Sequence, residues 1–395
     1  MSLELLYFLL NFSQELPTTA FSLVLLREFH VSAAQFNEID ALWYMTGILH
    51  PLWAFLSDQV PLMGKRRKHY LVLASLTTFV SGFLLGPLGV TTSLYAFVGV
   101  SMLTFMAQSM AETVVDCMAV ELGNLGDTKA ALQSKYMTMR TLGSMSGAAL
   151  SVGLLEVFSS RSILLFSSFG FLLTAGIAVG MSEDNPSLST QKVKRLRVGA
   201  KILWAPLLFV FIYSTTPSSE DTYYASLTFD DWQMSLSTFI GFLGSLTGSL
   251  LYWTLFTKWN GLINVFVAVT MIGVIGNLSP LLLVLGVSRG LPITCWIAFV
   301  TSLVSTLSVL PVLVLASSCA PRRLGLEGSM FSLFATTQHL GQLIAAVAAT
   351  KLTEALRLDL LIIVCAGAGL LPLIFAKSLL HSSTEHSLLT EPLIA

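Results

Sequence analysis

The sequence predicts an all-α membrane protein, with twelve transmembrane helices arranged as two six-helix bundles. Hydrophobic residues make up 54% of the 395-residue chain and charged residues only 11%, whereas soluble domains carry about 25% charged residues. Apolar runs recur along the whole chain, and one long polar loop divides them six and six. A soluble enzyme of this composition could not cover its surface with charged groups, so that class is excluded.

Each apolar run is long enough for a helix that crosses the bilayer, which takes about 20 residues. Helices are favoured over a β-barrel because barrel strands alternate in polarity and run for only about 10 residues. The predicted spans are 3–26, 35–56, 70–89, 93–121, 131–155, 162–181, 202–228, 234–256, 262–285, 291–318, 327–350 and 358–380.

Charge and polarity predict the organisation of the chain. The predicted parts are an N-terminal bundle (1–181), a basic cytoplasmic linker (182–201), a C-terminal bundle (202–380) and a cytoplasmic tail (381–395). One set of loops holds fourteen Lys and Arg residues and the other five. Cations gather on the cytoplasmic side, which places both termini in the cytoplasm. The plasma membrane and a vacuole-like endomembrane both remain open.

Several kinds of chemistry have no sequence signal. The four cysteines lie in apolar runs without CxxC spacing, so they indicate neither a metal site nor a disulfide framework. No phosphate-binding GxxxxGK[ST] loop occurs, so ATP does not drive the protein. Net charge is −1 and indicates no nucleic acid. We expect no enzyme, cofactor, metal or obligatory protein partner.

The stretch 51–70, "PLWAFLSDQVPLMGKRRKHY", places an acid before a basic cluster between spans two and three. The chain has six plus six predicted spans, and this loop resembles the loop between spans two and three in the major facilitator superfamily. An aspartate at a span end can hold a cation or a helix N-terminus. We therefore predict a conformational latch, although the cations could instead serve only as topology determinants. The predicted latch residues are Asp58, Gly64, Arg66 and Arg67.

The residue pattern of this loop is more specific than that of the superfamily, and it resembles the pattern of the folate–biopterin transporter family. The positions that match that family's pattern are Pro51, Leu52, Ser57, Asp58, Pro61, Gly64, Arg66, Arg67 and Tyr70. Stretches 111–121, 241–256 and 310–334 are similar to that family in the same order. The resemblance implies a transporter of folates or pterins.

Charged residues inside spans are costly, at about 2.5–3.5 kcal/mol each at mid-bilayer. The fourth span carries Gln108, Glu112 and Asp116 along one helical stripe, and the fifth carries Arg140. The two acids suit proton coupling, or they form a structural pair with a cation. Arg140 could pair with either acid or bind a substrate carboxylate.

The first and seventh spans carry further polar stripes. Glu15 lies on the first, whereas Tyr213, Glu220, Asp221 and Tyr224 lie on the seventh. In the superfamily that the chain resembles, spans one, four, seven and ten line the cavity. The resemblance therefore implies that these side chains meet substrate or protons, the tyrosines by stacking on a pterin ring.

We predict secondary active transport of folate or a biopterin-like pterin by alternating access, with protons as co-ion and the lipid bilayer as surroundings. Two alternatives stay open. One is a facilitator or symporter for another small organic solute. The other is a membrane scaffold that does not transport, which the polar stripes disfavour because a scaffold needs no buried charge.

Overall fold

The computed structural model describes twelve ranges of the chain. They are residues 3–31, 35–36, 39, 42–43, 45–87, 92–123, 129–181, 204–216, 231–259, 261–285, 290–319 and 327–376. Within these ranges the regular structure is helical, apart from an isolated antiparallel bridge between Leu62 and Lys65. The chain forms two compact units. Unit 1 comprises Met1–Asp127, Lys135–Leu188 and Ala320–Ser332, and unit 2 comprises Thr128–Ser134, Ser189–Cys319 and Leu333–Ala395.

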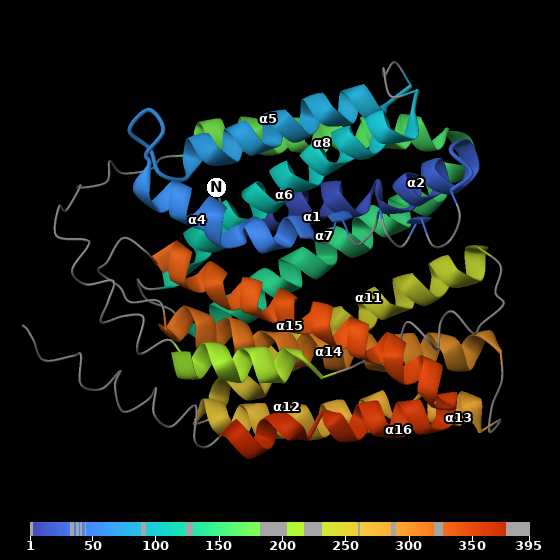
Figure 1. Ribbon diagram of the computed structural model, residues 1–395. Coiled ribbons are helices and arrows are strands. Elements are labelled where there is room, and N and C mark those ends of the chain that lie inside the picture. Colours follow the sequence, from blue (N-terminus) through green and yellow to red (C-terminus); the bar gives the residue numbers. More distant parts are fainter. Residues whose placement is uncertain are drawn as a thin grey trace, which may run out of the picture. The chain divides into compact units, whose positions relative to one another are not determined.

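Unit 1 is built on the helices of the N-terminal half. They are α1 (Leu3–Glu15), α2 (Thr18–Leu23), η1 (Val24–Glu28), η2 (Met45–Leu49), α4 (His50–Gln59), α5 (Lys68–Leu85), α6 (Leu94–Gly123), most of α7 (Lys129–Val157) and α8 (Ser160–Gly180). Helix α5 packs against α6 and α8, and α4 packs against α6 (Figure 1). Fully buried Val24, Phe97 and Ile163 form part of the core where η1, α6 and α8 meet.

Unit 2 holds the remaining helices. They are Trp204–Ser214, α11 (Asp231–Thr254), η3 (Phe256–Lys258), α12 (Leu262–Asn277), α13 (Leu281–Val284), α14 (Leu291–Cys319), most of α15 (Glu327–Ala355) and α16 (Leu358–Ala368). Helices α11 and α14 make the most extensive contact, and α12 packs against α14 and α16 (Figure 1). A Cβ atom at Gly244 would lie 2.1 Å from the carbonyl oxygen of Phe299, so α11 and α14 touch backbone to backbone.

The described helices follow the predicted spans closely. In the described part of the chain, six helices are long and apolar enough to cross a membrane: 68–85, 94–122, 160–180, 236–258, 291–319 and 358–376. Helix α7 is also long enough, but it carries four charges inside its 29 residues, Lys129, Lys135, Arg140 and Glu156. The predicted linker 182–201 and tail 381–395 lie outside the described residues, so the domain bounds stay a prediction.

Candidate functional site

An ion pair inside unit 1 joins three helices. Arg140 on α7 donates from Nη2 to Oδ1 of Asp116 on α6 at 2.5 Å. The Tyr7 hydroxyl on α1 donates to the same oxygen at 2.7 Å. The Arg140 guanidinium also lies 5.0 Å from the centre of the Tyr7 ring, and Tyr136 stacks on that ring at 4.8 Å. We call Tyr7, Asp116, Tyr136 and Arg140 the arginine cluster.

Two glycines on α7 let α1 come close enough to build this cluster. A Cβ atom at Gly143 would lie 2.3 Å from the carbonyl oxygen of Phe8, and one at Gly147 would lie 2.6 Å from that of Phe12. Real Cβ atoms do not approach backbone oxygen so closely, so only glycine fits at either position. Tight helix contacts in membranes commonly use such small residues, and here the contact brings Tyr7 under Arg140.

The arginine cluster is accessible as well as charged. About a quarter of each side chain of its ion pair is exposed, 25% for Arg140 and 23% for Asp116. One turn before Asp116 on α6, Glu112 Oε2 lies 4.0 Å from Nε2 of His50, the first residue of α4. An anionic solute could therefore reach Arg140 and compete with Asp116 for its planar, two-pronged guanidinium.

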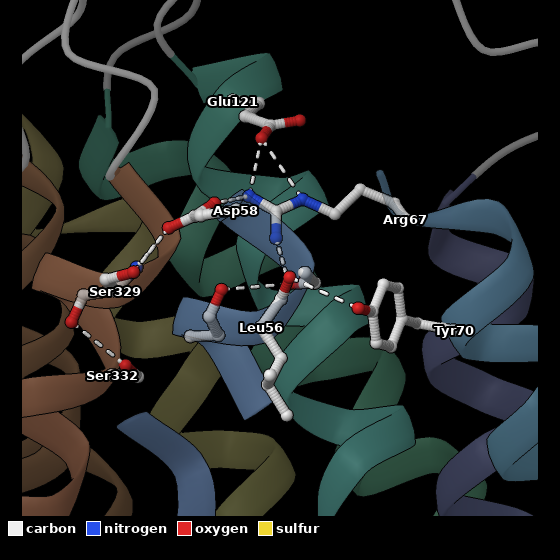
Figure 2. A network of polar contacts seen from close by, with 9 residues as sticks. Leu56, Asp58, Arg67, Tyr70, Glu121, Ser329 and Ser332 are labelled. Carbon is white, nitrogen blue, oxygen red and sulfur yellow. Dashed lines mark hydrogen bonds and ion pairs between the residues drawn. The ribbon is translucent and has the colours of Figure 1, made fainter. Parts of the chain in front are cut away.

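A second charged network lies at the end of α4 around a buried ion pair (Figure 2). Arg67, just before α5, is 2% exposed and Asp58 is 1% exposed. Arg67 donates to Asp58 Oδ1 and to the Ser57 hydroxyl. It also contacts Oε1 of Glu121 on α6, from Nη2 at 2.7 Å and from Nε at 3.2 Å. Burial acts to lower the pKa of Arg67, but the acidic groups around it, Asp58 and Glu121 among them, outweigh burial and raise the pKa above its ordinary value.

The same network reaches the first turn of α15 (Figure 2). Asp58 Oδ2 accepts hydrogen bonds from the Ser329 backbone N–H at 2.8 Å and from the Ser329 hydroxyl at 2.5 Å. A carboxylate at this position satisfies a free N–H group and opposes the positive end of the helix dipole. We call Ser57, Asp58, Arg67, Glu121 and Ser329 the Asp58 network.

The structure brings some of the predicted site residues together and separates others. Asp116 and Arg140 pair, as do Asp58 and Arg67. Gly64 has φ of +77°, a conformation that favours glycine, and forms the turn before the Asp58 network; Arg66 follows that turn and is partly exposed. Glu15 ends α1, two turns beyond Tyr7.

On the seventh span, the Tyr213 ring packs against Phe209 and Phe266. The remaining predicted residues of that span, Glu220, Asp221 and Tyr224, lie outside the described residues.

Sequence reasoning missed four polar residues of these sites: Tyr7, Glu121, Tyr136 and Ser329. Tyr7 stands one turn before Asn11, which begins the polar stripe of the first span. Extending that stripe backwards would have found it. Glu121 and Ser329 lie in the stretches that resemble the family, 111–121 and 310–334. Their partners are set by tertiary packing, which the local sequence does not show.

Solved structures with the same fold define the class. The proton:xylose symporter XylE, bound to 6-bromo-6-deoxy-D-glucose, superposes with a TM-score of 0.68 over 94% of this chain and 94% of its own, at 13% identity. The human organic anion transporter MFSD10 (TETRAN) gives 0.65 over 95% and 97%, at 15% identity. The chain is thus a multi-pass membrane protein with the major facilitator fold, and the predicted fold class is confirmed.

The sequence also identifies the family. The model of the BT1 family matches residues 12–203 and 191–387, and the chain belongs to that family. A folate-biopterin transporter of Synechocystis is 28% identical over 392 residues, covering 91% of this chain and 77% of that protein. Folate transporter 1 of Plasmodium falciparum is 25% identical, covering 85% and 71%. The resemblance read from the sequence is confirmed.

Proposed function

We propose that this transporter moves folates or biopterin-like pterins across a membrane by alternating access, with protons as co-ion. The arginine cluster is the observation that carries this proposal. It places an accessible cation on a helix inside the bundle, held by the Asp116 carboxylate, which a solute carboxylate could replace and which also accepts a hydrogen bond from the Tyr7 hydroxyl. The relatives named as folate or folate-biopterin transporters support the substrate class.

In this proposal, Arg140 binds a carboxylate of the solute. The guanidinium donates along two parallel directions and matches a carboxylate with two hydrogen bonds. Asp116 holds Arg140 when the site is empty, so the cation is never buried without a partner. The stacked rings of Tyr7 and Tyr136 are 2% and 4% exposed, so they pack behind Arg140 and offer no surface to a pterin ring.

The Asp58 network acts as the latch in this scheme. Ser329 belongs to unit 1, but from Leu333 onwards α15 belongs to unit 2. The bonds from Ser329 to Asp58 therefore tie the first turn of α15, the helix whose later turns belong to unit 2, to the buried Arg67. Breaking and remaking this contact would accompany the change between the two access states.

Energetics support coupling to protons for a folate cargo. Folate carries two negative charges, and moving each against an inside-negative potential costs about 2.3 kcal/mol per 100 mV. Entry together with at least two protons would cancel that electrical cost. A neutral biopterin would need no such compensation, so the number of protons would differ between the two cargoes.

The remaining predicted features belong to the same proposal. Both termini lie in the cytoplasm, because fourteen loop cations against five mark that side. Acidic Glu112, Glu220 and Asp221 and the two tyrosines Tyr213 and Tyr224 are proposed to serve substrate or proton contacts from the fourth and seventh spans.

Side-by-side uptake tests the substrate class. Cells that express the protein would receive labelled folate, labelled biopterin and an unrelated labelled organic anion in separate assays. We expect saturable uptake of folate or biopterin above that of vector-only cells, and none of the unrelated anion. Uptake of the unrelated anion alone, or of none of the three by protein that reaches the membrane, would contradict the proposal.

A further inference from the structure

Glu15 lies at the centre of the first helical run. Helix α1 ends at Glu15, and η1 ends at Glu28, so residue 15 falls midway between residues 3 and 28. With a rise of about 1.5 Å per residue, Glu15 is about 20 Å from either end of this run. Its side chain is partly buried, and its neighbours Leu16 and Ala20 are 4% and 0% exposed.

Within the described residues, Glu15 has neither a hydrogen-bond partner nor an ion-pair partner. Helices α6, α7 and α8 all contact α1. The cations they carry in unit 1 are engaged elsewhere: Lys135 with Glu4 at 2.5 Å, Arg140 with Asp116 and Arg161 with Glu28 at 2.6 Å. The other charged groups of these elements and of the first run are Glu112, Glu121, Lys129, Glu156 and Arg27, and none of them pairs with Glu15.

Asp116 differs from Glu15 in this respect. It already accepts hydrogen bonds from Arg140 and Tyr7, so proton binding there first requires that arrangement to break. An ionised Glu15 has no described group to offset the free energy of burying a charge, whereas a protonated Glu15 avoids most of that cost. Of these two carboxyl groups, Glu15 is therefore the one whose charge depends more directly on proton supply.

The backbone beside Glu15 is interrupted. Helix α1 gives way to a turn at Leu16 and Pro17 before α2 begins at Thr18. Proline has no N–H group, so the carbonyl of Ser13 loses its usual helical donor. Gly147 on α7 lies against this point, with its Cβ position 3.2 Å from Cβ of Glu15. A change of charge on Glu15 thus acts where α1 can bend.

We propose that Glu15 carries one of the protons of the transport cycle and is the group through which the pH gradient drives uptake, and that Asp116 serves substrate exchange at Arg140. The proposal rests on the proposed function. A proton from water on one side binds the Glu15 carboxylate as an O–H group, and it is released to water on the other side when the cargo leaves. No other bond forms or breaks.

The test uses the full-length protein in proteoliposomes with folate as the probe. Two readouts are taken: accumulation driven by an acidic outside, and counterflow exchange of labelled for unlabelled folate at equal pH. We expect Glu15→Gln to keep counterflow and to lose all stimulation by the pH gradient. The matched control is Glu4→Gln, which removes a carboxyl group on the same helix that pairs with Lys135, and it should keep both activities.

Gradient-driven accumulation by Glu15→Gln at the wild-type level would overturn the inference. A wild-type protein that exchanges folate but ignores the gradient would overturn both this inference and the proton coupling in the proposed function, and would leave folate transport itself standing. No exchange of folate or biopterin by the wild type would instead refute the proposed function. If Glu15→Gln loses counterflow as well, Glu15→Asp decides: restored gradient-driven uptake supports the proposal, and loss of both activities assigns Glu15 a structural role.

Discussion

Two arginines organise the polar interior of unit 1, and each is bound in a different way. Arg67 is almost fully buried and contacts two carboxylates and a hydroxyl, whereas Arg140 is a quarter exposed and contacts one carboxylate and the face of the Tyr7 ring. A buried cation with every donor engaged is suited to hold structure. An accessible cation with a single carboxylate partner is suited to exchange that partner for a ligand.

At the residue scale, we predict that Arg67→Ala destabilises the protein strongly. Removing one member of a buried ion pair costs about 3–5 kcal/mol, because the partner charge stays buried. The neighbouring Arg66 is partly exposed, so Arg66→Ala should cost less than about 1 kcal/mol. Thermal unfolding of the purified proteins in detergent measures both. Equal losses of stability in the two variants would contradict a stabilising role for the Asp58 network.

The sequence singled out the members of both ion pairs for local reasons, without choosing the pairs. Asp58 and Arg67 lie in one loop motif. Asp116 and Arg140 lie inside predicted spans, where an unpaired charge costs free energy, so each was expected to have a partner. The sequence could not choose between Glu112 and Asp116 as the partner of Arg140. That choice depends on how α1 packs on α7, which Gly143 and Gly147 set through backbone contact.

At the scale of elements, the start of α15 depends on one small residue. A Cβ atom at Gly328 would lie 2.3 Å from Sγ of Cys117 and 3.0 Å from Nη2 of Arg67. The first turn of α15 therefore rests directly on α6, and this contact holds Ser329 within reach of Asp58.

We predict that Gly328→Ala weakens this contact and lowers the melting temperature. Alanine is more favourable than glycine inside a helix by up to about 1 kcal/mol. At a helical position with free space around the new methyl group, this substitution would therefore raise stability. Gly367→Ala is the matched control, because no atom lies within 4 Å of its Cβ position. If the clash is the cause, Cys117→Ala should recover part of the loss in the double variant. Additive losses would contradict this explanation.

The helices themselves were largely predictable, because the length of each apolar run matches the bilayer. The break at Pro17 and the division of the first run into α1, α2 and η1 were not predicted. Hydropathy averages over about 19 residues and does not detect such a break.

At the scale of the whole molecule, the distribution of cations predicts the topology. Epitope tags at the two termini should both be reached by antibody only after the membrane is permeabilised on its cytoplasmic side. A tag in the 286–289 loop, between predicted spans nine and ten, should be reached from the opposite side. Termini on opposite sides would require an odd number of spans and would contradict the twelve-span arrangement.

The central claim is that a solute is carried past Arg140, and counterflow in proteoliposomes tests it most directly. Purified protein would be loaded with unlabelled folate or biopterin and given a trace of the labelled compound outside. If Arg140 binds the solute, we expect transient accumulation of label by the wild type. We expect none by an Arg140→Ala variant that is folded and reconstituted. Unchanged counterflow in Arg140→Ala would contradict the central claim.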